Sequence, residues 1–311
     1  MDLITFIIVT WNNQQQIRQC LQTIMKYTLV PYRIIVVDNH SSDETVQIIQ
    51  KEFSTVDLII SPDNVGFAKA NNLALWQVNS EYVCFINPDI ILTEDIINPS
   101  IHVLKEKQDV GLVSCKLRNL DSSLQPSCFH FADAYSLVAE ILHIGKIFPQ
   151  FLCKKYFMNF YNAKTDFYPQ WVIGAEMVMR TQEAKDIGGF STEYYMYTED
   201  MDLCKKIDCI LNKKIYYLAN ISLIHLGGAS EVQNFNYNKQ EKLIKNDLLF
   251  IKKFYGENEV HKVLRNMNRA YNFRLNLLNL FYYRNDKNLQ IDKTKKVIDI
   301  IKEIRDGYCS R

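Results

Sequence analysis

The first part of the chain alternates uninterrupted apolar runs with amphipathic segments, and this alternation constrains the fold more than any other feature. The apolar runs, rich in β-branched residues, span 3–9, 33–37, 57–60 and 82–86. Helix-like segments separate them at 14–27, 43–53 and 66–78. Strands that are apolar throughout are buried on both faces, and helical crossovers between them imply parallel pairing. We therefore expect an α/β fold with a mostly parallel, Rossmann-like sheet flanked by helices.

Polar residues follow three of the expected strands directly, at 10–13, 38–43 and 87–89. In sheets of this kind ligands bind beyond the carboxyl ends of the strands. We expect these polar segments to converge on one site.

Length and composition predict the domain organisation. The chain has 311 residues, 48% of them hydrophobic, which suits one large domain with an appendage. The sequence becomes helical and rich in Lys, Asn and Leu near residue 235. This shift predicts a domain at 1–235, with halves at about 1–106 and 107–235, followed by a helical extension at 236–311.

The charges are distributed unevenly. The net charge of +1 argues against nucleic acid as the main partner. Residues 240–311 nevertheless carry a net +7, which leaves −6 for residues 1–239. An acidic first part suits a site that gathers carboxylates around a cation. The basic part suits either a solvated helical surface or contact with anionic lipid or a phosphorylated acceptor.

Cysteine usage predicts a reducing compartment. The eight cysteines form no CxxC pair, and several lie inside apolar runs, as buried thiols do. The sequence begins with an apolar run rather than a basic leader, and no stretch reaches the roughly 18 uninterrupted apolar residues that span a bilayer. We expect a cytoplasmic protein.

Asp89 and His225 are candidate metal ligands. Asp89 follows a buried strand in an Asn-Pro-Asp turn, where its carboxylate could hold a hard divalent cation against a diphosphate. Asn-Pro-Asp is also a common turn sequence. His225 ends the apolar segment 221–224, either as a hydrogen-bonded structural residue or as a further ligand.

Asp38 is a candidate ligand-binding residue at the end of the second strand. Ser42 or Asp43 is placed to cap the next helix, whereas Asp38 lies too early to do so, which favours a contact to a base or ribose. A second polar set comprises Asn64, Gly66 and Lys69. The glycine permits close backbone approach to a ligand, and the lysine suits phosphate.

Three carboxylates open a predicted amphipathic helix: Glu199, Asp200 and Asp202. The helix dipole favours acidic residues in a first turn, so it accounts for at least one of them. A carboxylate can also serve as a general base, and a free Asp, with a pKa near ~3.9, is ionised at neutral pH.

Taken in order, these segments resemble the family 2 glycosyltransferases, specifically the bacterial rhamnosyltransferase-like branch. The matching motifs lie at 9–12, 36–43, 64–71, 87–89, 171–175, 188–190, 199–200 and 225, and the resemblance covers about residues 3–255. It implies a GT-A fold and inverting transfer of a sugar from a nucleotide-diphosphate donor. It also implies a Mn²⁺ or Mg²⁺ ion that bridges the donor diphosphate.

The resemblance also implies roles for individual residues. Asp200 is the catalytic base, and Asp89 and His225 hold the metal. The residues expected at the donor nucleotide are Thr10, Asn12, Asp38, Asn64, Gly66, Lys69 and Asn87. Those expected between donor sugar and acceptor are Trp171, Gly174, Ala175 and Glu199.

The sequence departs from the family pattern at three positions. Asn87 replaces the first aspartate of the Asp-x-Asp motif, so the metal is expected to bind mainly with the nucleotide. This replacement is common in the rhamnosyltransferase-like branch and favours dTDP-rhamnose, with UDP-sugars as the other candidates. Trp11 stands where relatives often have Tyr. Cys128 lies in a segment where relatives often place an Arg, which puts an acceptor or phosphate contact from that segment in doubt.

The sequence leaves open two alternatives to the transferase function and two interpretations of the C-terminal helices. A catalytically silent sugar-nucleotide-binding subunit is the main alternative, and Asn87 is the one sign of it. A nucleotidyltransferase would need a Gly-rich loop and a basic residue after the first strand, where residues 11–14 read Trp-Asn-Asn-Gln. The expected acceptor is a saccharide or lipid-linked saccharide for a surface polysaccharide. The amphipathic segment 271–283 suits a membrane surface or a partner, or packing on the catalytic domain.

Overall fold

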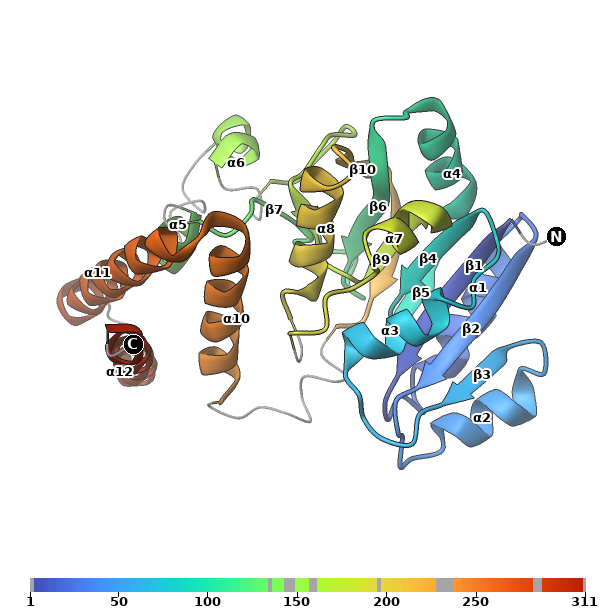
Figure 1. The fold of residues 1–311 in the computed structure, drawn as a ribbon, viewed down its shortest axis with the longest axis horizontal. Coiled ribbons are helices and arrows are strands. Elements are labelled where there is room, and N and C mark those ends of the chain that lie inside the picture. The colour runs from blue at the N-terminus through green and yellow to red at the C-terminus, as the bar shows by residue number, and fades with distance from the viewer. Residues whose placement is uncertain are drawn as a thin grey trace. The chain divides into compact units, whose positions relative to one another are not determined.

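An eight-stranded mixed sheet organises the larger part of the chain (Figure 1). The structure is a computed structural model that describes residues 3–133, 136–142, 149–156, 161–194, 197–227, 238–281 and 287–309. The strands are β1 (Ile4–Thr10), β2 (Tyr32–Asp38), β3 (Asp57–Ile60), β4 (Tyr82–Ile86), β5 (Ile90–Leu92), β6 (Val110–Arg118), β9 (Glu176–Arg180) and β10 (Lys214–His225). They lie in the order β3-β2-β1-β4-β9-β6-β10-β5.

Most neighbouring strands are parallel, as the apolar runs predict. The strands β3, β2, β1 and β4 are mutually parallel, and so are β6 and β10. The exceptions are β9, antiparallel to both of its neighbours, and β5, antiparallel to β10. A further antiparallel pair joins β7 (Cys128–Phe129) to β8 (Trp171–Val172).

Six helices accompany the sheet in the described part of this unit: α1 (Ile17–Tyr27), α2 (Thr45–Glu52), α3 (Phe67–Leu75), α4 (Ile97–Glu106), α7 (Thr181–Asp186) and α8 (Glu199–Cys209). Strands predicted at 57–60 and 82–86 have these bounds in the structure. The first helices begin later than predicted because a turn precedes each of them. At α2, for example, the carboxylate of Asp43 accepts the Thr45 N–H at 3.0 Å, but the N-cap residue is Glu44 rather than the expected Ser42 or Asp43.

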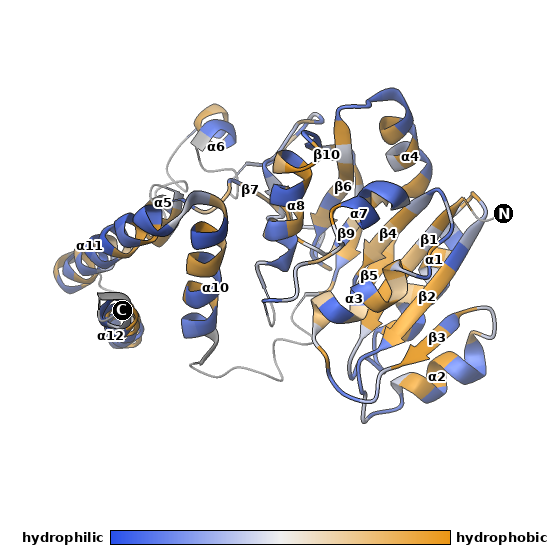
Figure 2. Ribbon diagram, in the orientation of Figure 1, coloured by the Kyte–Doolittle hydropathy of each residue, from blue (hydrophilic) through white to orange (hydrophobic). Residues whose placement is uncertain are grey.

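The core explains why the strands read as continuous apolar runs. Every residue of β1 is buried, and so is every residue of β4, because helices cover both faces of the sheet. Figure 2 shows these strands as predominantly hydrophobic, whereas the helices alternate between hydrophobic and hydrophilic residues. The burial confirms the two-sided sheet that the sequence predicts.

The chain divides into two compact units. One comprises residues 1–129 and 162–235 and carries the sheet, and the other comprises 130–161 and 236–311. The described helices of the second unit are α5 (Ser136–Ile141), α6 (Gln150–Tyr156), α10 (Asn238–Tyr255), α11 (Glu257–Phe281) and α12 (Lys287–Cys309). Residues 130–161 thus group with the C-terminal helices, although the sequence pattern assigns them to the first domain. The division into domains at 235 stays a prediction.

None of the helices in the described part of the chain combines the length and hydrophobicity needed to cross a lipid bilayer. The predicted helix at 271–283 is the last part of α11, and its final two residues lie outside the described ranges.

Candidate active site

Thr10 and Asp38 lie side by side at the carboxyl ends of two neighbouring parallel strands. The register pairs Thr10 of β1 with Asp38 of β2, and the Asn39 N–H donates to the Thr10 carbonyl at 2.8 Å. The strand β4 flanks β1 on its other side and leads into Asn87 and Asp89. The sheet thus brings three of the predicted polar segments to one edge.

Asp38 presents an unsatisfied carboxylate oxygen at this edge. Its side chain is buried, and Oδ2 accepts the Ser41 N–H at 3.0 Å. Its other oxygen, Oδ1, is also buried and has no hydrogen-bond partner among the described residues. A buried acceptor without a donor costs free energy, so this oxygen suits a donor group on a ligand.

Other residues predicted to bind the nucleotide serve to join loops. The Asn12 side-chain oxygen accepts the Ser42 N–H at 2.8 Å, and the Asn64 oxygen accepts from Asn39 Nδ2 at 2.9 Å. Gly66 has a left-handed backbone (φ 84°) directly before α3, a conformation that favours glycine. Lys69 lies exposed on α3. Asn12 and Asn64 therefore shape the wall of the site through these bonds.

Asp89 and His225 face each other although they are far apart in sequence. The strands β5 and β10 pair antiparallel, with Ile90 opposite His225, and the Leu226 N–H donates to the Asp89 carbonyl at 3.0 Å. This pairing brings His225 Nε2 to 3.3 Å from Asp89 Oδ1, with both side chains mostly buried. The structure therefore brings together the two predicted metal ligands.

Gln125 fixes the orientation of the His225 ring. His225 Nδ1 lies 2.7 Å from Gln125 Oε1, and in the tautomer with the proton on Nδ1 this nitrogen donates to the amide oxygen. In that tautomer of the neutral ring, Nε2 is unprotonated and its lone pair faces the Asp89 carboxylate. A cation between these two atoms would be bound by both of them. Metal-bound histidines commonly have such a hydrogen bond on the other nitrogen.

The carboxylate of Asp89 and the imidazole of His225 fit a divalent ion whose remaining ligands come from a bound substrate. Neighbouring ligands of an octahedral ion, each about 2.1 Å from it, lie about 3.0 Å apart, close to the Asp89–His225 separation. In the part of the chain that the structure describes, no group of three or more His, Cys, Asp or Glu side chains could hold a metal. If Asp89 and His225 bind a metal, they would supply two ligands, and a diphosphate would have to supply others.

Asp200 lies in the first turn of α8 and accepts two backbone hydrogen bonds. Its Oδ2 accepts the Gly174 N–H at 3.0 Å, and its Oδ1 accepts the Met201 N–H at 2.8 Å. Burial raises the pKa of Asp200, whereas these N–H groups oppose that rise by favouring the charged form. These hydrogen bonds therefore favour the charged form of Asp200, the form that a general base requires.

Glu199 is the more deeply buried partner of this carboxyl pair. Its side chain is buried, and Oε2 has no partner among the described residues. Burial and the negative charge of Asp200 raise the pKa of Glu199 far above its ordinary value. Two adjacent carboxyls titrate as a pair; burial favours the protonated form of Glu199, whereas the N–H groups of Gly174 and Met201 favour the charged form of Asp200.

The backbone before this pair adopts an unusual conformation. Tyr197 and Thr198 both have left-handed backbones, with φ of 70° and 76°. This conformation is uncommon for residues other than glycine, and each instance costs of order 1 kcal/mol or more. Surrounding contacts must hold the chain in this path.

The motif 171–175 connects Asp200, the predicted base, to the loop that carries Asp89, a predicted metal ligand. Gly174 binds Asp200, while the carbonyl of Ala175 accepts the Asn87 N–H at 2.9 Å. Trp171 stacks on Phe129 across the β7–β8 pair, with ring centroids 4.5 Å apart. Backbone contacts thus link Asp200, Gly174, Ala175 and Asn87 in a continuous chain that leads to Asp89.

Sequence reasoning missed several residues of this region. Gln125 was recognisable only by its contact with His225, which is 100 positions away. Asp202 and Lys206 form a buried ion pair next to Asp200, and Asn72 binds the backbone at Phe190. A hint was available for Asp202, since three carboxylates in one turn exceed what a helix dipole requires.

Comparison with known proteins identifies glycosyltransferases as relatives of this chain. Residues 5–161 match the profile of Glycosyl transferase family 2. The rhamnosyltransferase WbbL of Escherichia coli is 27% identical over 233 residues, which cover 72% of this chain and 83% of that protein. The N-acetylglucosaminyl-diphospho-decaprenol L-rhamnosyltransferase of Mycobacterium tuberculosis is 23% identical over 226 residues, covering 65% and 69%.

Solved structures share the fold. TarS 1–349 of S. aureus in complex with UDP-GlcNAc aligns with a TM-score of 0.55 and 18% identity, over 97% of this chain and 82% of that one. The mannosyltransferase PcManGT from Pyrobaculum calidifontis, in complex with GDP-Man and Mn²⁺, aligns with a TM-score of 0.59 and 13% identity, over 96% and 85%.

The mostly parallel sheet and its likeness to these structures define a GT-A fold, as expected from the sequence. This fold, with carboxylates at one edge of its sheet, defines the class of nucleotide-sugar transferases. The chain belongs to glycosyl transferase family 2, and it is a glycosyltransferase.

Proposed function

We propose that this enzyme transfers rhamnose, with inversion, from dTDP-rhamnose to a hydroxyl of a glycan or lipid-linked glycan in surface polysaccharide biosynthesis. The two rhamnosyltransferases among its relatives support the donor sugar, and the name of the mycobacterial relative supports a diphospho-polyprenol-linked acceptor. UDP-sugars are the alternative donors, because the TarS neighbour was solved with UDP-GlcNAc.

The unpaired Oδ1 of Asp38 is the observation that carries the nucleotide assignment. It is a buried acceptor at the end of β2 that no described residue satisfies. The imide N–H of thymine or uracil is a donor, whereas the matching ring nitrogen of cytosine accepts. We assign Asp38 to the base of a dTDP or UDP donor, with Thr10, Asn12, Asn64, Gly66 and Lys69 around the nucleotide.

The carboxyl pair supplies the proton chemistry. Asp200 removes the proton of the acceptor hydroxyl as that oxygen forms a bond to the anomeric carbon, and the bond from this carbon to the diphosphate oxygen breaks. Glu199 keeps its own proton, so it can donate a hydrogen bond to a sugar hydroxyl. Trp171, Gly174 and Ala175 would line the place where donor sugar and acceptor meet.

Asp89 and His225 would hold a Mn²⁺ or Mg²⁺ ion together with the donor diphosphate. When bound, such an ion neutralises the charge that develops on the leaving diphosphate. Asn87 contributes its backbone N–H to Ala175, so the short loop between β4 and β5 presents the carboxylate of Asp89 on a fixed backbone. The Nδ1–Gln125 bond keeps His225 Nε2 turned toward Asp89.

The test is thermal stability in the presence of dTDP, UDP, GDP or ADP, each with and without Mn²⁺. A nucleotide at about 100 times its dissociation constant should stabilise the protein by roughly 2.7 kcal/mol. We expect dTDP or UDP to stabilise it only with Mn²⁺, and His225→Ala to weaken this metal-dependent stabilisation. Asp38→Ala should abolish the response, while Asp63→Ala, an exposed residue in a nearby loop, should leave it intact.

An absent response to all four nucleotides would contradict this proposal. Stabilisation by a nucleotide without any transfer of sugar would instead favour the silent binding subunit.

We further propose that the enzyme works in the cytoplasm, on the inner face of the plasma membrane, through its C-terminal helices. Three apolar side chains of α11 are exposed, namely Phe273, Leu277 and Leu280. Their spacing places them on one face of the helix, and Arg265 and Arg269 lie exposed on the adjoining part of that face. Apolar residues beside arginines suit the headgroup region of an anionic bilayer.

A further inference from the structure

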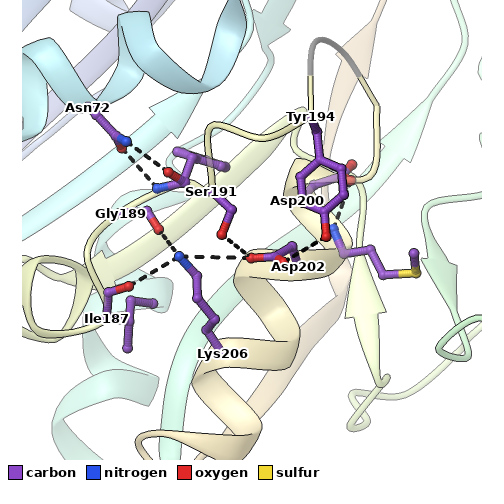
Figure 3. A network of polar contacts seen from close by, with 10 residues as sticks. Asn72, Ile187, Gly189, Ser191, Tyr194, Asp200, Asp202 and Lys206 are labelled. Carbon is purple, nitrogen blue, oxygen red and sulfur yellow. Dashed lines mark hydrogen bonds and ion pairs between the residues drawn. The ribbon is translucent and has the colours of Figure 1, made fainter. Parts of the chain in front are cut away.

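The segment that leads into the catalytic helix is attached to that helix by a network of polar contacts (Figure 3). At its centre lies Asp202, which is fully buried in the first turn of α8. Its Oδ1 accepts a hydrogen bond from Ser191 Oγ, and its Oδ2 accepts one from Tyr194 OH at 3.0 Å. Asp202 thus binds two residues that precede the helix in sequence.

Lys206, one turn further along α8, extends the network to the beginning of the segment. Its Nζ donates to the carbonyls of Ile187, at 3.1 Å, and Gly189, and lies 3.9 Å from Asp202 Oδ1. Asn72 of α3 binds both the N–H and the carbonyl of Phe190, at 2.9 and 2.8 Å. Side chains from two helices therefore fix the backbone from Ile187 to Tyr194.

The direction in which the chain enters α8 depends on this attachment. Tyr197 and Thr198 adopt left-handed backbones immediately before the helix, and the Asp202 N–H donates to the Thr198 carbonyl at 2.8 Å. Without anchoring contacts on both sides, residues in such a conformation would relax. The next residues are the carboxyl pair, so a change in their path would move Asp200 away from the Gly174 N–H, now at 3.0 Å.

We propose that Asp202 is the positioning residue for Asp200. By holding Ser191 and Tyr194 against α8, it sets where the helix begins, and this places the Asp200 carboxylate against the Gly174 N–H. The inference rests on the proposed function only in naming Asp200 as the base. The hydrogen bond that it describes can be measured without any sugar transfer.

The test uses the full-length double variant Ser191→Ala/Tyr194→Phe. It removes both hydroxyl donors but leaves the buried Asp202–Lys206 pair intact, which guards against unfolding from an uncompensated charge. The pKa of Asp200 is read from carbon-13 spectra of carboxyl-labelled aspartate, with its signal assigned by its absence in Asp200→Asn. Because the Gly174 hydrogen bond favours the ionised form, its loss should raise the pKa of Asp200 by about one unit.

A second measurement follows catalysis with dTDP-rhamnose, Mn²⁺ and N-acetylglucosaminyl-diphospho-farnesol. We expect kcat to fall roughly 10- to 100-fold, the acid limb of the pH profile to move upward with the pKa, and dTDP affinity to stay within about twofold because the nucleotide contacts are separate. Asp208→Asn is the matched control, since it lies on the same helix and pairs with Lys205 at the surface. It should leave the pKa of Asp200 and kcat unchanged.

The outcomes separate this inference from the proposed function. An unshifted pKa of Asp200 in the double variant overturns the positioning role, whatever happens to activity. A shifted pKa in a protein whose Asp200→Asn variant still transfers sugar supports the positioning role and overturns the assignment of the base. Should the double variant lose dTDP binding through unfolding, Tyr194→Phe alone must show part of the shift, and its absence there overturns the proposal.

Discussion

At the residue scale, Glu176 is a buried acid that the proposed chemistry does not use. It is fully buried on β9, where Oε2 accepts the Cys115 N–H at 3.0 Å and Oε1 has no partner among the described residues. The pairing of β6 with β9 extends only to Val113 and Val178, so the side chain satisfies an N–H where these strands separate. Burial raises the pKa of Glu176 to about 7.

This raised pKa predicts a dependence of stability on pH. The carboxyl of the unfolded chain ionises near ~4.3, while the folded protein keeps Glu176 protonated up to about pH 7. The stability contributed by the protonated form is therefore complete below the unfolded pKa and is lost as the pH rises to about 7. The loss is roughly 4 kcal/mol by linkage. We expect Glu176→Gln to flatten this part of the profile and to be more stable than wild type at pH 8.

The measurement is urea unfolding at several pH values from 5 to 8. The exposed Glu106→Gln is the control, and it should keep the wild-type slope. Parallel profiles for Glu176→Gln and wild type would show that Glu176 ionises normally.

At the scale of elements, the short segment between α7 and α8 shows why a Gly-Gly-Phe motif is needed. Gly188 and Gly189 have left-handed backbones, with φ of 74° and 63°. A Cβ on Gly189 would lie 2.3 Å from the side-chain oxygen of Asn72, whereas one on Gly188 would meet nothing within 4 Å. Phe190 then packs edge-on against Phe67 and Phe85. The motif thus fixes this segment against Asn72 and the neighbouring aromatic side chains, although the family resemblance lists it among the motifs of the site.

The two glycines offer a matched pair of substitutions. Gly188→Ala should cost only the backbone strain, about 1 kcal/mol. Gly189→Ala should cost roughly 3 kcal/mol, because it adds a collision with Asn72 to a similar strain. Urea unfolding measures both changes, and equal losses would mean that Asn72 moves aside without cost.

At the scale of the whole molecule, the chain combines a sheet-bearing unit with a second unit made of described helices. Within the second unit α11 packs against α5, α10 and α12. Its opposite face nevertheless exposes the apolar residues Phe273, Leu277 and Leu280. This face is the one we assign to the membrane surface.

Vesicle flotation tests that assignment with the full-length protein. We expect it to float with vesicles that contain phosphatidylglycerol and much less with neutral vesicles. Replacing Arg265 and Arg269 by Gln should weaken binding about 10- to 30-fold, at about 1 kcal/mol for each cation near the surface. Replacing Phe273, Leu277 and Leu280 by Ser should abolish it. Leu29→Ser, an exposed apolar residue of the other unit, serves as the control. Undiminished flotation of the triple variant would contradict a membrane role for α11.

The sequence by itself determined the first four strands of the sheet and the candidate residues at its edge. Continuous apolar runs report burial on both faces, and this burial is a local property, so β1 to β4 and their crossover helices could be predicted. Motif order was enough to select Asp38, Asp89, Asp200 and His225, whose roles stay predictions.

Only the tertiary structure decided how these residues are held. Three features leave no periodic pattern in the sequence. They are the Gln125 hydrogen bond that orients His225, the unpaired oxygen of Asp38, and the hydrogen bonds from Ser191 and Tyr194 to Asp202. They are hydrogen bonds, or the lack of them, between groups that folding alone brings together. The raised pKa of Glu199 likewise follows from its burial beside Asp200. A sequence lists the groups that can donate, accept or ionise, but their free energies depend on distance and on exclusion of water, and the packed chain sets both.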